Sequence, residues 1–147
     1  MRAFIVAMAI AGPLLGAGMA AHAASLQACE QTVEYTVQPP GADVPETLRG
    51  FSGVWIGKMD TGLCIATIVN SISPDGSAQI TYVNGSMGGQ YPVKAGNRKI
   101  TAKIVGGKLT TSGSNVSTDY TLRGTNELVF SYVHKTAGRS MGLLKRQ

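Results

Sequence analysis

Short runs of alternating apolar and polar residues fill the chain from Phe51 onward. In the clearest run, Ile100, Ala102 and Ile104 fall on one face of an extended segment, and Lys99, Thr101 and Lys103 fall on the other. A period of two is typical of a strand with one buried face. Turn residues separate the runs, and no helix of useful length is indicated. The same stripes recur at Ile80 with Tyr82, Tyr120 with Leu122, and Leu128 with Phe130 and Tyr132.

The links between these segments have the length of hairpin turns, which favours a closed sheet. Closing an antiparallel sheet removes exposed edges and gives all inward side chains a common core. We therefore predict an all-β domain over residues 51–147, a small antiparallel up-and-down β-barrel of about eight strands. A small β-sandwich is the alternative.

The first 23 residues have a different pattern. Arg2 precedes a long apolar run, which Pro13 and several glycines interrupt and which ends in the small-x-small sequence 21–23. A membrane anchor would be followed by a basic flank, and no such flank follows this run. Residues 1–23 are therefore predicted to be a cleaved bacterial signal peptide, and the mature protein is expected in the periplasm or outside the cell.

A competing cleavage site lies before Cys29. Residues 25–28 loosely resemble a bacterial lipoprotein box, although Gln27 is unusual there and the apolar core ends well before it. Cleavage at this site would place lipid on Cys29 and make the protein an envelope lipoprotein. Cleavage after Ala23 is favoured.

The two cysteines, Cys29 and Cys64, both survive cleavage after Ala23 and enter an oxidising compartment. We expect one disulfide between them, which would pin the N-terminal arm, residues 24–50, onto the barrel. Within this otherwise irregular arm, residues 32–37 could form a short strand and residues 43–50 one helical turn. Under the lipoprotein alternative Cys64 would be left alone.

The charge balance is mildly basic. Removing the signal peptide lowers the Lys and Arg count from 13 to 12 against 8 Asp and Glu, so the net charge is near +4. Basic residues gather in one predicted hairpin. We interpret them as the solvated face of a sheet, in preference to a surface that contacts anionic envelope components. Nucleic acid is not an expected partner because few aromatic residues interleave these charges. The basic residues are Lys94, Arg98, Lys99, Lys103 and Lys108.

No catalytic or metal-binding constellation is evident. His134 is the one histidine outside the predicted signal peptide, and no G-x-S-x-G motif accompanies it. One histidine, paired cysteines and scattered carboxylates offer no metal-ligand spacing. We expect neither enzymatic activity nor a cofactor.

The glycine-rich loop after residue 84 lacks the ending of a phosphate-binding loop, but Ser86, Met87 and Gln90 could border an open barrel mouth.

The segment FSGVWIG, residues 51–57, carries a family resemblance. Together with the strands that follow, it resembles the calycin plan of lipocalins and avidins and is similar to secreted proteobacterial barrel modules with an FSGxWxG start. The resemblance covers residues 51–146. It implies that Trp55 plugs one end of the barrel beneath a basic residue, for which Arg139 and Arg146 are the candidates.

The interior is open to two interpretations. The chain has a single Trp, whereas avidin-like sites are lined by several, so biotin binding is not expected. The inward side chains could fill the barrel completely, which is favoured, or they could line a ligand pocket. The candidate pocket residues are Tyr82, Tyr120, Phe130, Tyr132 and Met141.

These observations predict a non-enzymatic binding module whose partner is a small apolar ligand or an extracellular protein. A second resemblance supplies an alternative function. Small periplasmic inhibitors of secreted metalloproteases are also barrels with a G-x-W start and one disulfide, and their N-terminal arm enters the protease cleft. Here the inhibitory arm would begin at Ala24.

Overall fold

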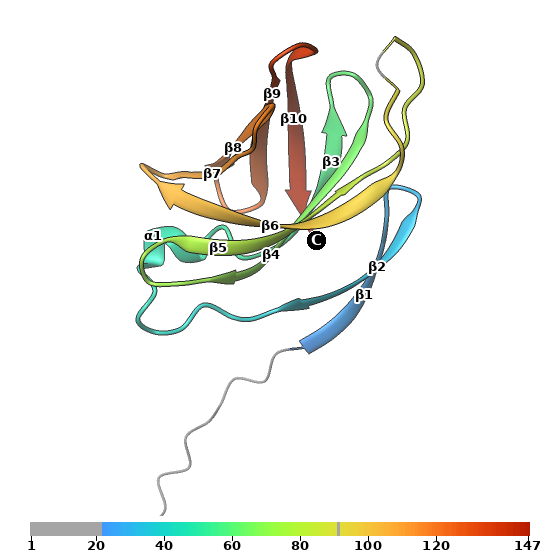
Figure 1. The fold of residues 1–147 in the computed structure, drawn as a ribbon. Helices are drawn as coiled ribbons and strands as arrows, with labels where there is room; N and C mark the ends of the chain where they lie inside the picture. The colour runs from blue at the N-terminus through green and yellow to red at the C-terminus, as the bar shows by residue number, and fades with distance from the viewer. Residues whose placement is uncertain (1–21, 91) are drawn as a thin grey trace, which may run out of the picture.

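The computed structural model describes residues 22–90 and 92–147, which form a closed antiparallel barrel with an N-terminal hairpin beside it (Figure 1). Each barrel strand pairs with the next, and the last strand pairs with the first. The predicted all-β barrel of eight strands is therefore confirmed. The strands are β3 (Gly53–Met59), β4 (Cys64–Ile72), β5 (Ser77–Asn84), β6 (Gly96–Val105), β7 (Lys108–Ser112), β8 (Val116–Arg123), β9 (Glu127–His134) and β10 (Gly138–Arg146).

The N-terminal arm is more regular than its sequence indicates. β1 (His22–Ala28) and β2 (Gln31–Val37) form an antiparallel hairpin, and α1 (Glu46–Arg49) is one short helical turn.

The predicted signal peptide lies mainly outside the described residues. Its predicted end, Ala23, lies within β1, so cleavage there would remove the pairs at residues 22 and 23 and leave the pairs from Ala24 to Ala28. No helix in the described part of the chain is long and apolar enough to span a membrane.

The hairpin covers the outer face of β4. Val33, Leu26 and Tyr35 pack with Ala66 and Ile68 in a hydrophobic cluster outside the barrel. The alternate residues of β4 face the barrel interior, so both faces of this strand are buried. This double burial accounts for the nearly continuous apolar run at residues 64–69, which a strand with one solvated face would not need.

The predicted disulfide between Cys29 and Cys64 is confirmed, with a Cα–Cα distance of 5.3 Å. It joins the β1–β2 turn to the start of β4 and lies against Gly85, where an added Cβ would be 3.4 Å from the Cys64 Cβ. Next to it, the Glu30 carboxylate accepts hydrogen bonds from the Ser86 amide (3.0 Å) and hydroxyl (2.7 Å). These bonds lower the pKa of Glu30, so its carboxylate stays charged at neutral pH. The hairpin is thus tied to the beginning of the β5–β6 loop.

One end of the barrel is closed by Trp55, which is fully buried. Its indole N–H donates to the Phe51 carbonyl (2.9 Å), and the Arg146 guanidinium lies 4.0 Å from the ring centroid. Arg146 also donates to the carbonyls of Ser52 and Gly50, each at 2.7 Å. Of the two candidate basic residues, Arg146 therefore lies over Trp55.

Arg139 lies near the opposite end of β10, where it borders the open end of the barrel. The two arginines are separated by most of one strand. They occupy different ends of the barrel and cannot share one role.

Two glycines lie at the seam where β10 pairs with β3. A Cβ added at Gly57 would clash with the Leu143 carbonyl oxygen, and one at Gly142 would be 2.8 Å from the Lys58 carbonyl oxygen. The backbones therefore approach too closely for any side chain at these positions.

Replacing Gly57 with Ala should destabilise the barrel by about 1–3 kcal/mol, because the seam must open to admit the methyl group. Urea unfolding followed by circular dichroism would measure the loss. Gly96→Ala is the matched control, since Gly96 is also a strand residue but has no atom within 4 Å of its added Cβ. Equal unfolding midpoints for the two variants would contradict the seam argument.

Candidate functional site

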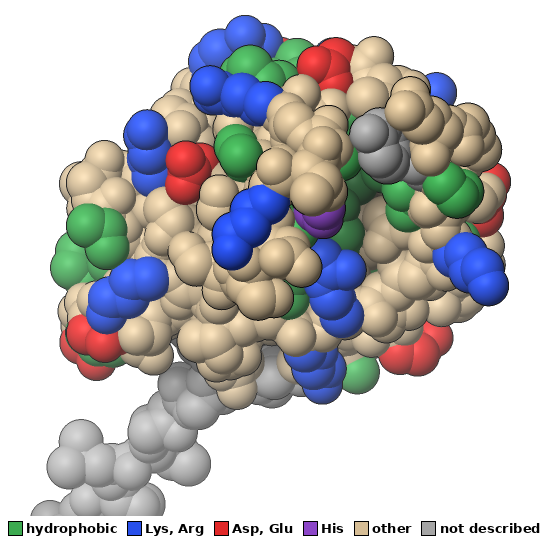
Figure 2. All heavy atoms as spheres, turned by 45° about the horizontal axis from the view of Figure 1, so that its top comes forward, with side chains coloured by type: hydrophobic (Ala, Val, Ile, Leu, Met, Phe, Trp, Pro, Cys, Tyr) green, Lys and Arg blue, Asp and Glu red, His purple; other side chains and the backbone are tan. Residues whose placement is uncertain are grey.

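The barrel end remote from Trp55 is hollow. A cavity of about 470 Å³ opens between the ends of the strands and three loops. Figure 2 shows hydrophobic side chains within a hollow at this end, with histidine and basic side chains beside it. The cavity is lined by Met59, Thr61, Leu63, Tyr82, Asn84, Met87, Gln90, Pro92, Val93, Arg98, Tyr132, His134, Thr136, Ala137, Gly138, Arg139 and Ser140.

Aromatic rings form a continuous row from the core to the cavity rim. The Phe130 ring centroid lies 4.9 Å from that of Tyr120, 6.4 Å from that of Tyr82 and 6.3 Å from that of Tyr132. At the rim, the Tyr132 and His134 rings are stacked with 6.5 Å between centroids. Alternation along β9 places Phe130, Tyr132 and His134 on one face, so the row follows directly from the strand period.

Arg98 contributes a positive charge to the cavity. It is the cross-strand partner of Tyr82, and its guanidinium carbon lies 4.7 Å from the Tyr82 ring centroid. This distance is typical of a cation–π contact. The two ion pairs found in the described part of the chain join Lys103 to Asp75 and Arg123 to Glu127, so neither uses the Arg98 charge.

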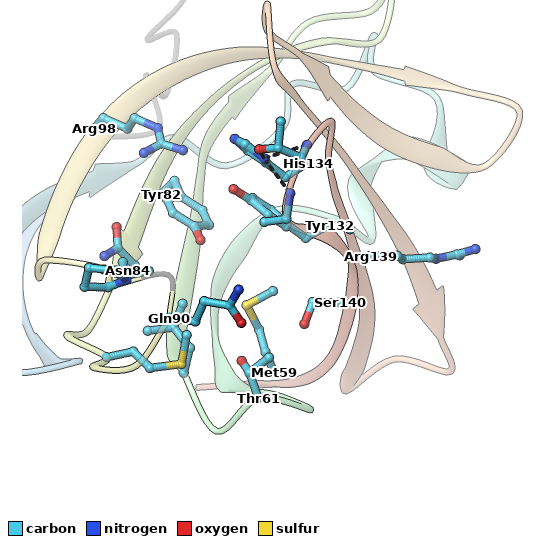
Figure 3. Close-up of a pocket in the computed structure, with 17 residues that line it drawn as sticks. Met59, Thr61, Tyr82, Asn84, Gln90, Arg98, Tyr132, His134, Arg139 and Ser140 are labelled. Carbon is cyan, nitrogen blue, oxygen red and sulfur yellow. Dashed lines mark hydrogen bonds between the residues drawn. The ribbon is translucent and has the colours of Figure 1, made fainter.

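His134 has a defined tautomer. Its Nδ1 accepts hydrogen bonds from the backbone amides of Thr136 (3.2 Å) and Ala137 (3.1 Å). A nitrogen that accepts from two amides carries no proton, so in the neutral ring the proton is on Nε2. In Figure 3 the His134 ring and Arg98 lie toward one side of the cavity, and Met59 lies toward the other. Tyr82 and Tyr132 lie between the two sides.

The β5–β6 loop forms one wall of the cavity. The Asn84 side-chain amide donates to the carbonyls of Gly85 (3.0 Å) and Lys94 (2.7 Å), which holds the base of the loop together. Farther along, Met87 and Val93 exchange backbone hydrogen bonds of 2.9 and 2.8 Å. These bonds place two apolar side chains at the rim.

Burial governs the tyrosine hydroxyls. It raises the pKa of Tyr120 to about 12 and raises the pKa of Tyr82 as well. Both hydroxyls are therefore protonated at neutral pH and act as neutral hydrogen-bonding groups. Among residues 22–90 and 92–147, no cluster of three or more His, Cys, Asp or Glu side chains could hold a metal ion.

The structure separates the five candidate pocket residues. Tyr82 and Tyr132 line the cavity, whereas Tyr120 and Phe130 are fully buried beneath it. Met141 lies on the outer face of β10 with 43% of its surface exposed, because the alternate residues Ser140 and Leu144 are the ones that face inward. The prediction that Met141 lines the pocket is therefore wrong.

Arg98, Asn84 and His134 line the cavity but were not among the candidate pocket residues, although each extends a predicted stripe by one step. Arg98 lies two residues before Ile100, Asn84 two residues after Tyr82, and His134 two residues after Tyr132. Following each stripe to the end of its strand would have found them. The predicted border residues Met87 and Gln90 line the cavity, while Ser86 bonds to Glu30 instead.

No protein-family model matches the sequence, and the search of curated proteins finds no match. Among solved structures, the chain is similar to a redesigned β-barrel, mFAP1, bound to DFHBI. The similarity has 12% sequence identity and a TM-score of 0.48, and it covers 70% of this chain and 100% of the other.

Proposed function

We propose that this protein is a secreted or periplasmic, non-enzymatic binding module that takes a small molecule into the open end of its barrel. The observation that carries the proposal is the cavity of about 470 Å³, whose lining combines aromatic and apolar side chains with polar ones. Its volume falls in the range of about 300–1,000 Å³ typical of small-molecule sites. Because the other end is filled by Trp55, the ligand would enter only beside Tyr82 and Tyr132.

A binding role suits the chemistry of the cavity better than catalysis. The buried tyrosine hydroxyls are held in their protonated forms, and the Nδ1 atom of His134 is used by two backbone amides. A general base needs an accessible acceptor in reach of its substrate. In the neutral tautomer described above, His134 offers the cavity a donor.

Export is supported by the predicted signal peptide together with the Cys29–Cys64 disulfide, which is compatible with an oxidising compartment. The lipoprotein alternative has less support, because lipid on the Cys29 sulfur and a bond from that sulfur to Cys64 exclude each other. The inhibitor alternative also loses support. Its extended arm would begin at Ala24, but residues 22–28 are paired along their length with β2.

The fluorescent probe N-phenyl-1-naphthylamine tests the proposal, because it is neutral and apolar and brightens in a dry pocket. We expect it to bind the full-length mature protein, and we expect Tyr132→Ala to weaken binding about five- to tenfold through loss of one aromatic contact. Fluorescence titration measures both.

Tyr35→Ala is the matched control, because Tyr35 is a half-buried tyrosine that packs outside the barrel. It should leave the affinity for the probe unchanged. No binding, or equal weakening by both substitutions, would overturn the proposed function. Thermal unfolding of each variant shows whether it is folded under the titration conditions.

A further inference from the structure

We infer that the ligand of this cavity is an anionic amphiphile, a small molecule with an apolar body and one carboxylate or similar anionic group. The inference rests on the proposed function and adds the chemical class of the ligand. It is carried by the separation of charge and apolar surface within the cavity.

All charged residues that line the cavity are basic. Arg98 and Arg139 are among the lining residues, and neither Asp nor Glu is. Figure 3 shows the Arg139 side chain pointing away from the cavity, whereas Arg98 extends toward Tyr82. Arg98 is therefore the charge that a bound molecule meets.

Two carboxylates belong to segments that border the cavity, and neither forms an ion pair with Arg98. The Asp60 carboxylate accepts a hydrogen bond from the hydroxyl of the lining residue Ser140, and the Glu30 carboxylate accepts one from the Ser86 hydroxyl. Within the residues that the structure describes, no ion pair or hydrogen bond uses the Arg98 guanidinium. Its donors are available for a carboxylate, which a guanidinium binds through two parallel hydrogen bonds.

The setting of Arg98 strengthens this interaction. One face of its guanidinium lies on the buried Tyr82 ring, which excludes water from that side. A charge beside a low-dielectric wall interacts with an anion more strongly than one surrounded by water. The protonated Nε2 of His134, on the same side of the cavity, supplies a further donor.

The remaining surface suits the apolar body of the ligand. Met59 and Leu63 are buried at the opposite wall, and Phe130 lies beneath Tyr82 and Tyr132. An amphiphile would place its rings or chain against these side chains and its anion at Arg98. A cationic ligand would meet an unpaired positive charge, and a neutral one would form no ion pair with the guanidinium, which belongs to an exposed residue and stays hydrated.

Two related dyes test the inference. 1-Anilinonaphthalene-8-sulfonate is the same phenylnaphthylamine skeleton as the neutral probe with one sulfonate added. We expect the wild-type protein to bind the sulfonate dye more tightly than the neutral one. Arg98→Gln should weaken the sulfonate dye about 10- to 100-fold, as for loss of a charge-assisted bidentate contact, and should change the neutral dye by less than about twofold.

Lys99→Gln is the matched control. It removes the same charge from the adjacent residue of β6, which faces away from the cavity. It should change neither affinity by more than about twofold. Tyr132→Ala should weaken both dyes, which places them in the cavity.

The outcomes separate the two proposals. If the neutral dye binds the cavity but Arg98→Gln leaves the sulfonate dye unaffected, the anionic ligand class is overturned and the proposed function stands. Equal weakening of both dyes by Arg98→Gln would likewise overturn it, since Arg98 would then act only as part of the wall. If the neutral dye does not bind, the proposed function itself fails.

Discussion

Trp55→Ala should destabilise the protein by about 3–5 kcal/mol, the range for truncating a large buried aromatic side chain. Trp55 is fully buried, and its ring supports the Arg146 guanidinium at 4.0 Å. Removal of the ring would leave a cavity at the closed end and would also remove the indole donor to the Phe51 carbonyl. The free energy of unfolding, from urea titration, is the quantity to compare.

Trp55→Phe is the companion variant, because it keeps a ring beneath Arg146 but loses the indole N–H. It should lose clearly less stability than Trp55→Ala. Binding of the neutral dye at the opposite end should survive in Trp55→Phe at temperatures where it is folded. A loss below about 1 kcal/mol for Trp55→Ala would show that the closed end repacks around the gap, which a closely packed end could not do.

The barrel was predictable because its strands carry their own signal. The Ile100, Ala102 and Ile104 stripe has the period of a half-buried strand whatever its neighbours are. The disulfide was predictable from two cysteines and a predicted oxidising compartment. β1 was not predictable, because HAASLQA has no clear alternation and its order depends on β2 and on the outer face of β4, distant in sequence.

The part of the site that lies on strands with a clear period of two was predictable from the sequence. Tyr82 and Tyr132 lie on clear stripes, whereas β10 permits two patterns, with Met141 or Leu144 inward. An apolar pair at Met141 and Leu143 favours the first pattern. The second is adopted because Gly142 must face the close backbone of β3, where any side chain would clash. That constraint comes from barrel closure and is not visible in β10 alone.

Replacing both cysteines, as Cys29→Ser with Cys64→Ser, should destabilise the protein by about 3–4 kcal/mol in the chain-entropy model. The bond closes a segment with a sequence separation of 35 residues, and its loss frees that segment in the unfolded chain. Urea unfolding of the double variant against the wild type measures the difference. A reducing agent should shift the wild type toward the variant and leave the variant itself unaffected.

The same variant should also weaken dye binding, because the disulfide lies against Gly85 at the start of the loop that carries Met87 and Val93 to the cavity rim. Without the bond, that loop is held from the hairpin side by the Glu30–Ser86 and Gln31–Asn84 hydrogen bonds. We therefore expect a several-fold loss of affinity for the neutral dye under conditions where the variant is fully folded. Unchanged affinity, with stability reduced as expected, would mean that the disulfide fastens the hairpin without positioning the cavity wall.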